Sequence, residues 1–456
     1  MLAGLSAVSV LPAACTSTPP IGEALERAVF THGVASGDPD HDSVVLWTRL
    51  GGGKTSARWW LARDDRFNDV VASGEVATGP ESDYTVKVAA SGLRPGETGY
   101  YRFEAGEVVS PLGRTRTLPM GTLDSVGMAV ASCANYPLGR FHAYRAIALD
   151  PDVDIVVHLG DYIYEYPADG WGHDSGLRMG RLHEPAHETV TLADYRTRIG
   201  QYRSDPDLQL MHAHHPIIML WDDHETANNP WMHGAENHQP EEGDWTARRA
   251  ASLQARYEWL PVRDPGPGED GRDYWRHYRW GDLASLVTLE VRHSGRDRQL
   301  NWGEHYRDAN SPEGLEQFRK AVLGDPSREI LSAPMTRFME ASIDEIVERE
   351  VTWPVLASPV QMGRIHWAPL TGSRYDALEA TATGYLARKL PAVRSMGRAN
   401  LPPSLDDWGG SPAARERLLQ AWSGHGIDHL LVLSGDTHGF WANVLTADDG
   451  RQVGAE

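Results

Sequence analysis

From Ser125 onward, short apolar runs alternate with segments of helical periodicity. The apolar runs include VGMAVASC, VDIVVHLGD, PIIMLWDD and DHLLVLSGD, and the helix-like segment FHAYRAIAL follows the first of them. Runs without an alternating polar face are typical of strands that are buried on both sides, as in α/β proteins. We therefore predict an α/β domain over residues 121–456.

The preceding part of the chain has a different pattern, in which short alternating segments are separated by turns rich in Gly, Pro and Asp. The strands expected from this pattern are Ser43–Leu50, Ala57–Ala62, Tyr84–Ala89 and Gly99–Ala105. Such a pattern is typical of a small β-sandwich. The segment SGLRPGETGYYRFEAG resembles the late strand of fibronectin-III-like domains. We predict an all-β domain over residues 28–120, without a catalytic constellation.

Polar residues with metal-binding or acid–base chemistry follow the apolar runs of the α/β part. The runs finish in SC, GD, DDH and GDTH. Because α/β proteins place their sites at the carboxyl edge of the sheet, these endings are expected to meet in one site.

The N-terminal segment, residues 1–27, begins with an apolar run from Met1 to Ala14 that is too short to span a bilayer. It is typical of a signal peptide that lacks its basic start. Leu11–Cys15 loosely resembles a lipoprotein cleavage box, although Pro12 stands where Leu is usual. We therefore expect an exported protein, either periplasmic, at the cell surface or secreted, with simple cleavage and lipidation of Cys15 as the two alternatives. Membrane anchoring is expected only through that lipidated cysteine.

The charge balance limits the possible partners. Lys and Arg total 43 against 63 Asp and Glu, which gives a formal net charge of -20. Such a surface repels nucleic acid and anionic membranes, so neither is expected as the main partner. A phosphate substrate would need local positive charge, and bound metal ions are a dense source of it.

The chain has two cysteines, Cys15 and Cys133. If the first lies in a cleaved leader, the remaining thiol cannot form an internal disulfide. Cys133 is then either a small buried apolar side chain or a thiolate metal ligand. The motifs that accompany it favour the second interpretation.

The segment VVHLGDYIYE places Asp161 after a strand and a Gly turn, and Tyr164 three residues later. A strand-end carboxylate can bridge two cations, and a phenolate can reach one of them if it is Fe(III). A second strand ends in Asp222, Asp223, His224 and Glu225. Consecutive ionisable residues are costly there unless each has a partner, although a capped helix start is an alternative.

The segment LLVLSGDTHGFW places Asp436 and His438 after a third strand, two positions apart and therefore on the same side of an extended chain. Likewise, Asn135 follows Cys133 by two positions. Several histidines lie in the long irregular stretches 166–188 and 229–248 and are expected to be solvated loop residues: His173, His183, His187, His233 and His238.

The motifs SCANY, GDYIYE, WDDHE and SGDTHGFW resemble, in this order and spacing, those of PhoD-type alkaline phosphatases in the calcineurin-like metallophosphoesterase superfamily. The opening THGVASGDPDHDSVVLWTRL resembles the N-terminal domain of the same family. The resemblance implies a metallophosphoesterase-like β-sandwich flanked by helices, preceded by a small domain of the immunoglobulin or fibronectin-III type. The family typically continues beyond RQVGAE, so a C-terminal truncation is expected.

The resemblance also implies roles for individual residues. Asp161 would bridge two metals, Cys133 and Tyr164 would ligate Fe3+, and carboxylates in place of Asn and His ligands would shift the second site toward Ca2+. The implied metal ligands are Cys133, Asp161, Tyr164, Asp223, Asn228, Asp436 and His438. The implied catalytic residues are His224 as proton donor, Asn135, and Arg292 as a planar phosphate clamp.

The function that we expect is an exported phosphoesterase of the alkaline phosphatase type. It would hydrolyse small-molecule phosphate monoesters, with diesters as further substrates, by attack of a metal-activated hydroxide at a binuclear Fe/Ca centre. Two alternatives stay open: a phosphodiesterase or phospholipase D-like enzyme, and a cell-surface binding protein on a degenerate hydrolase fold.

Overall fold

The computed structural model describes residues 29–305, 311–367 and 372–456. The predicted leader and Cys15 lie outside these residues. Among the described helices, none combines the length and apolarity needed to cross a membrane.

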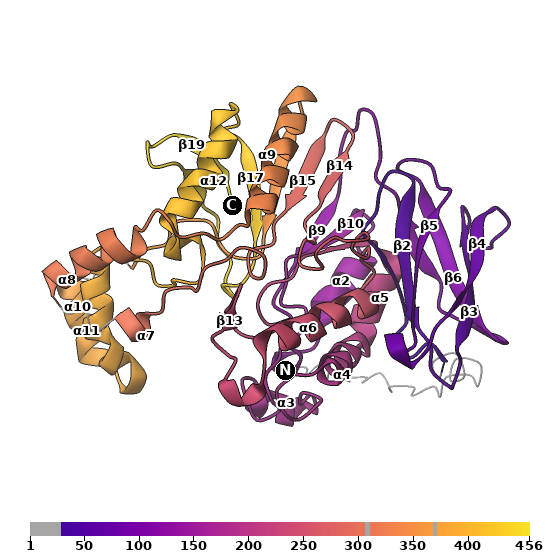
Figure 1. The fold of residues 1–456 in the computed structure, drawn as a ribbon, viewed down its shortest axis with the longest axis horizontal. Coiled ribbons are helices and arrows are strands. Elements are labelled where there is room, and N and C mark those ends of the chain that lie inside the picture. Colours follow the sequence, from indigo (N-terminus) through magenta and orange to yellow (C-terminus); the bar gives the residue numbers. More distant parts are fainter. Residues whose placement is uncertain (1–28, 306–310, 368–371) are drawn as a thin grey trace, which may run out of the picture.

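Two six-stranded sheets form the centre of the molecule (Figure 1). The first has the order β5 (Thr85–Ser91), β2 (Ser43–Arg49), β1 (Val34–Gly37), β11 (Ile217–Met219), β10 (Ile155–His158) and β9 (Met128–Ala131). The second has the order β14 (His277–Trp280), β15 (Ala284–Thr288), β16 (Trp353–Ser358), β17 (Leu430–Ser434), β19 (Gln452–Ala455) and β18 (Val444–Thr446).

The two sheets pack face to face through one apolar layer. Ile155 and Val157 of β10 and Ile218 of β11 belong to the same buried cluster as Leu286 of β15 and Ala357 of β16. Strands β10 and β11 are buried along their whole length, because one face meets the other sheet and the opposite face meets helices. This double burial is the reason for their continuous apolar sequences.

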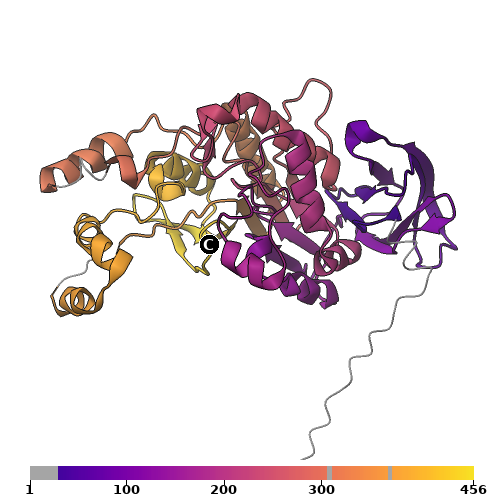
Figure 2. The same ribbon diagram turned by 90° about the horizontal axis from the view of Figure 1, so that it is seen from below.

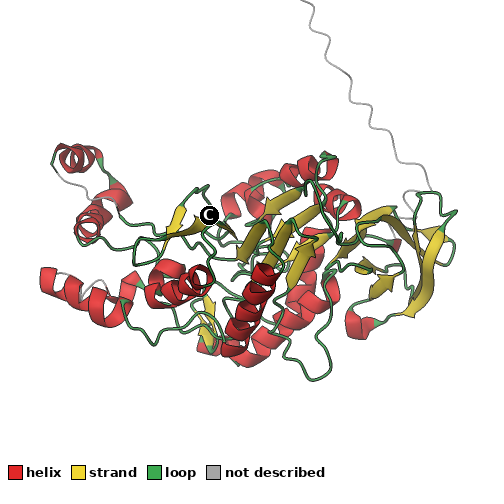
Figure 3. Ribbon diagram, turned by 90° about the horizontal axis from the view of Figure 1, so that it is seen from above, coloured by secondary structure: helices red, strands yellow, loops and turns green. Residues whose placement is uncertain are grey.

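Helices cover both outer faces of this pair of sheets (Figure 3). Those that share an apolar cluster with the first sheet are α2 (His142–Leu149), α4 (Leu192–Arg203), α5 (Pro206–His214) and α6 (Trp245–Trp259). Those that cover the second sheet are α9 (Ala333–Glu348) and α12 (Pro412–Gly424). Local signals mark their starts: Thr191 and Asp194 form a capping box at α4, and Asp205 caps α5 before a proline at the first turn.

The N-terminal strands form a second, smaller sandwich. Its outer sheet consists of β4 (Val70–Ala77), β3 (Ser56–Ala62), β6 (Thr98–Ala105), β7 (Val108–Val109) and β8 (Gly113–Arg116). This sheet packs on β1, β2 and β5 through a core of its own. The strands expected from the sequence over residues 28–120 are present, whereas the specific likeness to immunoglobulin or fibronectin-III domains stays a prediction.

The N-terminal sandwich is continuous with the central sheet, because β1 pairs in parallel with β11 at Gly37 and Ile217. The amide of Asp38 also donates a hydrogen bond of 2.9 Å to the carbonyl of Ile217. A side chain at position 37 would place its Cβ 2.6 Å from that carbonyl, so glycine permits the approach. The predicted boundary near residue 120 therefore divides the sequence but not the hydrogen-bonded sheet.

Several helices of the described residues project at the end of the molecule opposite the N-terminal strands (Figure 2). They are α7 (Trp302–His305), α8 (Pro312–Gln317), α10 (Ser373–Thr381) and α11 (Gly384–Arg398). The two long stretches predicted to be irregular contain regular elements: α3 (His173–Met179) in the first, and the pair β12 (Pro230–Trp231) and β13 (Gly234–Ala235) in the second. The second stretch also includes the first turn of α6, which begins at Trp245.

Candidate metal centre

The candidate site lies where the carboxyl ends of strands from both central sheets meet. Strands β9, β10 and β11 run parallel in the first sheet, as do β15, β16 and β17 in the second. The loops after these strands therefore leave from one edge of the sandwich. Those that carry the predicted residues contribute Cys133 after β9, Asp161 after β10, Asp223 after β11, Arg292 after β15, and Asp436 with His438 after β17.

The backbone of these loops is held in uncommon conformations. Cys133, Asp161, Asp436 and His438 have φ angles of 58°, 55°, 71° and 51°, in the left-handed region that non-glycine residues rarely adopt. Each such residue costs about 1–3 kcal/mol, and such residues cluster at functional sites, where the surrounding structure holds them.

The glycine before Asp161 has a steric reason. Gly160 has a φ of 119°, and a Cβ added there would lie 2.5 Å from the backbone nitrogen of Asp222. The loop after β10 thus approaches the loop after β11 more closely than any side chain would allow, which brings the two groups of carboxylates together.

The first group of potential ligands combines sulfur, oxygen and nitrogen. One ligand atom from each of Cys133, Asp161 and His438 lies within 4.8 Å of the others. The Tyr164 hydroxyl donates a 2.8 Å hydrogen bond to Oδ2 of Asp161 and lies 3.2 Å from Nε2 of His438. A thiolate, a phenolate, an imidazole and a carboxylate together are typical of a transition-metal site.

The second group contains oxygen alone and is formed by Asp222, Asp223 and Asp436. A third set links the two groups, because Asp161, Asp223 and His224 also have ligand atoms within 4.8 Å of one another. An all-carboxylate group favours a hard cation, and Asp161 lies where a carboxylate could contact ions in both positions.

Several buried oxygens of these carboxylates have no hydrogen-bond partner among the described residues. They are Oδ1 of Asp161, Oδ2 of Asp222 and Oδ1 of Asp223. Burial raises the pKa of Asp161 well above its usual value, and it raises that of Asp222 to about 6. Burial also raises the pKa of the Cys133 thiol. Bound cations would satisfy these oxygens and favour the charged forms, so the residues present fit a metal site.

His224 is held from behind by Glu165. The fully buried Oε2 of Glu165 lies 2.7 Å from Nδ1 of His224, while Nε2 of His224 faces the site at 3.8 Å from Oδ2 of Asp223. Burial opposes protonation, but the neighbouring carboxylates, Asp223 first among them, raise the pKa of His224 well above its usual value. An ionised Glu165 only accepts hydrogen bonds, so Nδ1 of His224 carries a proton, and Nε2 is the ring nitrogen that faces the carboxylate groups.

The two predicted asparagines lie in different surroundings. Asn135 is buried, and neither polar atom of its amide has a partner among the described residues, so it is available to a ligand. Asn228 accepts a 3.2 Å hydrogen bond from the Tyr166 hydroxyl, and its backbone N–H donates to Glu165. The amide oxygen of Asn228 is thus already engaged, and its role as a metal ligand stays a prediction.

Arg292, predicted as a phosphate clamp, lies against the acidic group. Its side chain is fully buried, with Nε 2.6 Å from Asp222 and Nη1 2.7 Å from Asp406. Nη2 has no hydrogen bond within the described structure and lies 3.8 Å from Asp223 and 3.7 Å from Asp436. Two of the three nitrogens therefore anchor the acidic group, which leaves Nη2 for any contact with phosphate.

Sequence reasoning missed Glu165 and Asp406 as site residues. Glu165 directly follows Tyr164 in the motif GDYIYE, in which the sequence predicts only Asp161 and Tyr164 as metal ligands. Asp406 comes from a loop without a recognisable motif, 114 positions from its partner Arg292. The predicted loop histidines are absent from all three potential metal groups among the described residues. The prediction that they are solvated is wrong for His183, which is buried, with its ring nitrogens 3.0 Å from the Tyr166 carbonyl and 3.0 Å from the Tyr202 hydroxyl.

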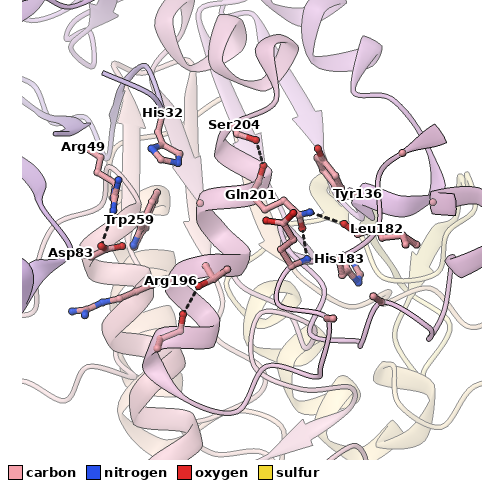
Figure 4. A pocket seen from close by; sticks show the side chains of 18 of the residues that line it. His32, Arg49, Asp83, Tyr136, Leu182, His183, Arg196, Gln201, Ser204 and Trp259 are labelled. Carbon is pink, nitrogen blue, oxygen red and sulfur yellow. Dashed lines mark hydrogen bonds and ion pairs between the residues drawn. The ribbon is translucent and has the colours of Figure 1, made fainter. Parts of the chain in front are cut away.

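Two hollows adjoin this part of the molecule. The one beside the candidate site has a volume of about 430 Å³ and is lined in part by Cys133, Tyr164 and His438. A larger cleft of about 1020 Å³ lies along α4, and Figure 4 shows its lining side chains. Arg49 and Arg196 on its wall are paired with Asp83 and Glu258. The charges of these two arginines are therefore already paired within the protein. None of the potential metal ligands of the described residues lines this cleft.

Comparison with known proteins agrees with the sequence motifs. The family model described as PhoD-like phosphatase matches residues 128–456, and that of the PhoD-like phosphatase N-terminal domain matches residues 14–119. Alkaline phosphatase D of Bacillus subtilis (strain 168) is 34% identical over 436 residues, which cover 92% of this chain and 66% of that protein. A solved structure of PhoD aligns with 33% identity and a TM-score of 0.75, over 94% of this chain and 76% of that one.

Proposed function

The chain belongs to the PhoD-like phosphatase family, and we propose that it is a metal-dependent phosphoesterase of the alkaline phosphatase type that hydrolyses small phosphate monoesters. The observation that carries this proposal is the convergence of a mixed sulfur, nitrogen and oxygen group with an all-carboxylate group at one sheet edge. The chain spans slightly less than two thirds of the curated relative that it matches. For this reason, we propose the phosphatase activity of that relative for this chain and do not take it over from the match alone.

For the metals, we propose Fe3+ in the mixed group and Ca2+ in the carboxylate group. The residues that would hold Fe3+ are Cys133, Tyr164, Asp161 and His438, and those that would hold Ca2+ are Asp161, Asp223 and Asp436, with Asn228 as a further ligand. When bound, these cations supply positive charge to the phosphate oxygens and lower the pKa of bound water.

The protein residues supply proton transfer and orientation. His224 donates a proton to the leaving alcohol, and Glu165 holds the ring in the required tautomer and orientation through the 2.7 Å contact at Nδ1. The unpartnered amide of Asn135 and Nη2 of Arg292 offer donors to phosphate oxygens. Arg292 also offsets part of the negative charge of Asp222 and Asp223.

We further propose export, on the basis of the apolar run Met1–Ala14. In an oxidising compartment an unligated thiolate would be vulnerable to oxidation, and ligation by a metal would protect it. Mass spectrometry of the protein recovered from the producing cells tests this point, because cleavage or lipidation near Cys15 would identify the route.

The central experiment measures metal content and turnover on the same purified protein. We expect stoichiometric iron and calcium, a visible charge-transfer absorption, and reversible loss of activity with EGTA. Asp161→Asn should lose both metals and turnover, whereas Asp428→Asn, whose side chain is 82% exposed, serves as the matched control. A colourless, iron-free protein that is fully active with zinc would contradict the iron assignment.

The same preparation distinguishes the alternative functions. Rates on 4-nitrophenyl phosphate and bis(4-nitrophenyl) phosphate compare monoester and diester hydrolysis. A faster rate on the diester would show that the enzyme is a phosphodiesterase and not a monoesterase. Absence of both turnover and stoichiometric iron would instead favour a binding protein on a degenerate hydrolase fold.

A further inference from the structure

We propose that the 430 Å³ cavity beside His438 receives the leaving alcohol and selects esters whose alcohol is flat and apolar with a negative charge at its far end. This inference rests on the proposed phosphoesterase function. It assigns binding residues, Trp171, Leu138 and Arg140, that belong to none of the metal groups.

The position of the cavity places its occupant next to the reacting phosphate. Cys133, Tyr164 and His438, three of the proposed iron ligands, form part of its lining. A phosphate ester bound beside these residues would therefore extend its alcohol group into this space. A volume of about 430 Å³ falls in the range of small-molecule sites and accommodates an aromatic ring with a substituent.

Trp171 provides a flat apolar wall. Its ring stacks on His438 with centroids 5.2 Å apart and planes at 20°, and it meets Tyr164 edge-on at 5.6 Å. The residue nevertheless stays 43% exposed. A tryptophan with one face packed against the site and other parts open to solvent presents a preorganised surface for stacking, because few torsions have to be fixed on binding.

The loop that carries Trp171 is seated by close contacts with the loop after Cys133. A Cβ at Gly172, which has a φ of 95°, would lie 3.0 Å from the Cβ of Pro137 and 3.3 Å from a methyl group of Leu138. A Cβ at Gly176 would meet the same proline at 3.0 Å. These glycines let the two loops pack together, so that the walls of the cavity are fixed relative to the metal ligands.

The polar groups of the cavity indicate an anionic substituent. Arg140 lines it and is exposed, and none of its described lining residues is an aspartate or glutamate. In a chain with a net charge of -20, an arginine at this position favours a carboxylate or a second phosphate on the alcohol.

The test compares each variant with the parent on the same substrate, so that the intrinsic reactivity of the leaving group cancels. Trp171→Ala should lower kcat/KM for phenyl phosphate by about tenfold, because stacking and burial of the aryl group are lost, and leave glycerol 1-phosphate within about twofold. Trp171→Phe should recover most of the loss. Trp353→Ala, at a 50% exposed tryptophan of β16, is the control.

Charge recognition is tested with 4-carboxyphenyl phosphate and its neutral analogue 4-carbamoylphenyl phosphate. Arg140→Gln should lower kcat/KM for the carboxylate by about threefold, as expected for an exposed ion pair, and leave the amide unchanged. Arg94→Gln, at an arginine with a 76% exposed side chain, is the matched control. Iron content should equal that of the parent in every variant.

Equal losses on phenyl phosphate and glycerol 1-phosphate, or lost iron in Trp171→Ala, would overturn the proposal, because Trp171 would then support the metal site alone. If the parent hydrolyses none of these esters, the proposed function fails, and calorimetric binding of 4-carboxyphenylphosphonate still tests the cavity. Binding that is weakened by Trp171→Ala and Arg140→Gln supports the subsite, and binding that is unaffected by both overturns it.

Discussion

Replacement of Glu165 by glutamine is the most direct perturbation of the proposed proton donor. The carboxylate is fully buried and is shared among three contacts: Nδ1 of His224 at 2.7 Å, the backbone N–H of Asn228 at 2.7 Å, and the side-chain amide of Asn237 at 2.8 Å. Burial alone would raise the pKa of Glu165, but its contacts, with His224 foremost, lower it. The native carboxylate is therefore ionised.

Glutamine keeps the shape of this side chain but removes the charge and one acceptor. Its NH₂ group must face either Nδ1 of His224 or the donors of Asn228 and Asn237. A charge-assisted hydrogen bond contributes about 1.5–3 kcal/mol. If that stabilisation helps to hold His224 protonated in the transition state, its loss corresponds to a decrease in kcat of about tenfold to about 150-fold.

The decrease should depend on the leaving group. Esters of poorly acidic alcohols need the proton and should show the full loss, whereas 4-nitrophenyl phosphate should show little. The assay is a series of aryl and alkyl phosphates, with metal content and circular dichroism measured on each preparation. Glu340→Gln, at an exposed position on α9, is the control. A folded, metal-replete Glu165→Gln protein that keeps the parent rate on poor leaving groups would refute the reasoning.

Three further variants test other parts of the structure. Cys133→Ala should lose iron and most turnover while the fold stays intact, and Cys133→Asp should recover part of both; a folded Ala variant that retains iron and activity would make Cys133 a packing residue. Gly160→Ala should reduce stability by at least about 1–3 kcal/mol and weaken metal binding, because its Cβ would lie 2.5 Å from the nitrogen of Asp222; denaturant unfolding and elemental analysis would check this. Burial lowers the pKa of His158 from 6.5 to about 3, so its contribution to stability is fully present above pH 6.5 and lost as the pH falls toward 3, a loss of about 2 kcal/mol by pH 5. His158→Gln should therefore flatten the fall in unfolding free energy between pH 7 and 5, and an unchanged slope would show that other groups cause it.

The sequence by itself determined the local elements and the family. Buried strands such as β10 and β11 were predictable because their continuous apolar runs have few alternatives in a globular chain. The motifs at their ends singled out Asp161 and Asp223, because ionisable residues there need partners or a function, and the structure brings the two carboxylates together. The family comparison confirmed the resemblance that these motifs carried.

Tertiary structure alone decided how these elements combine. The pairing of Gly37 with Ile217 joins the N-terminal strands to the central sheet, and its partners are 180 positions apart (217 − 37). Tertiary packing also turns Arg292 inward toward Asp406 and places Trp171 against His438. Such contacts depend on which surfaces meet after the chain has folded, whereas hydrophobic periodicity reports only which face of each element is buried.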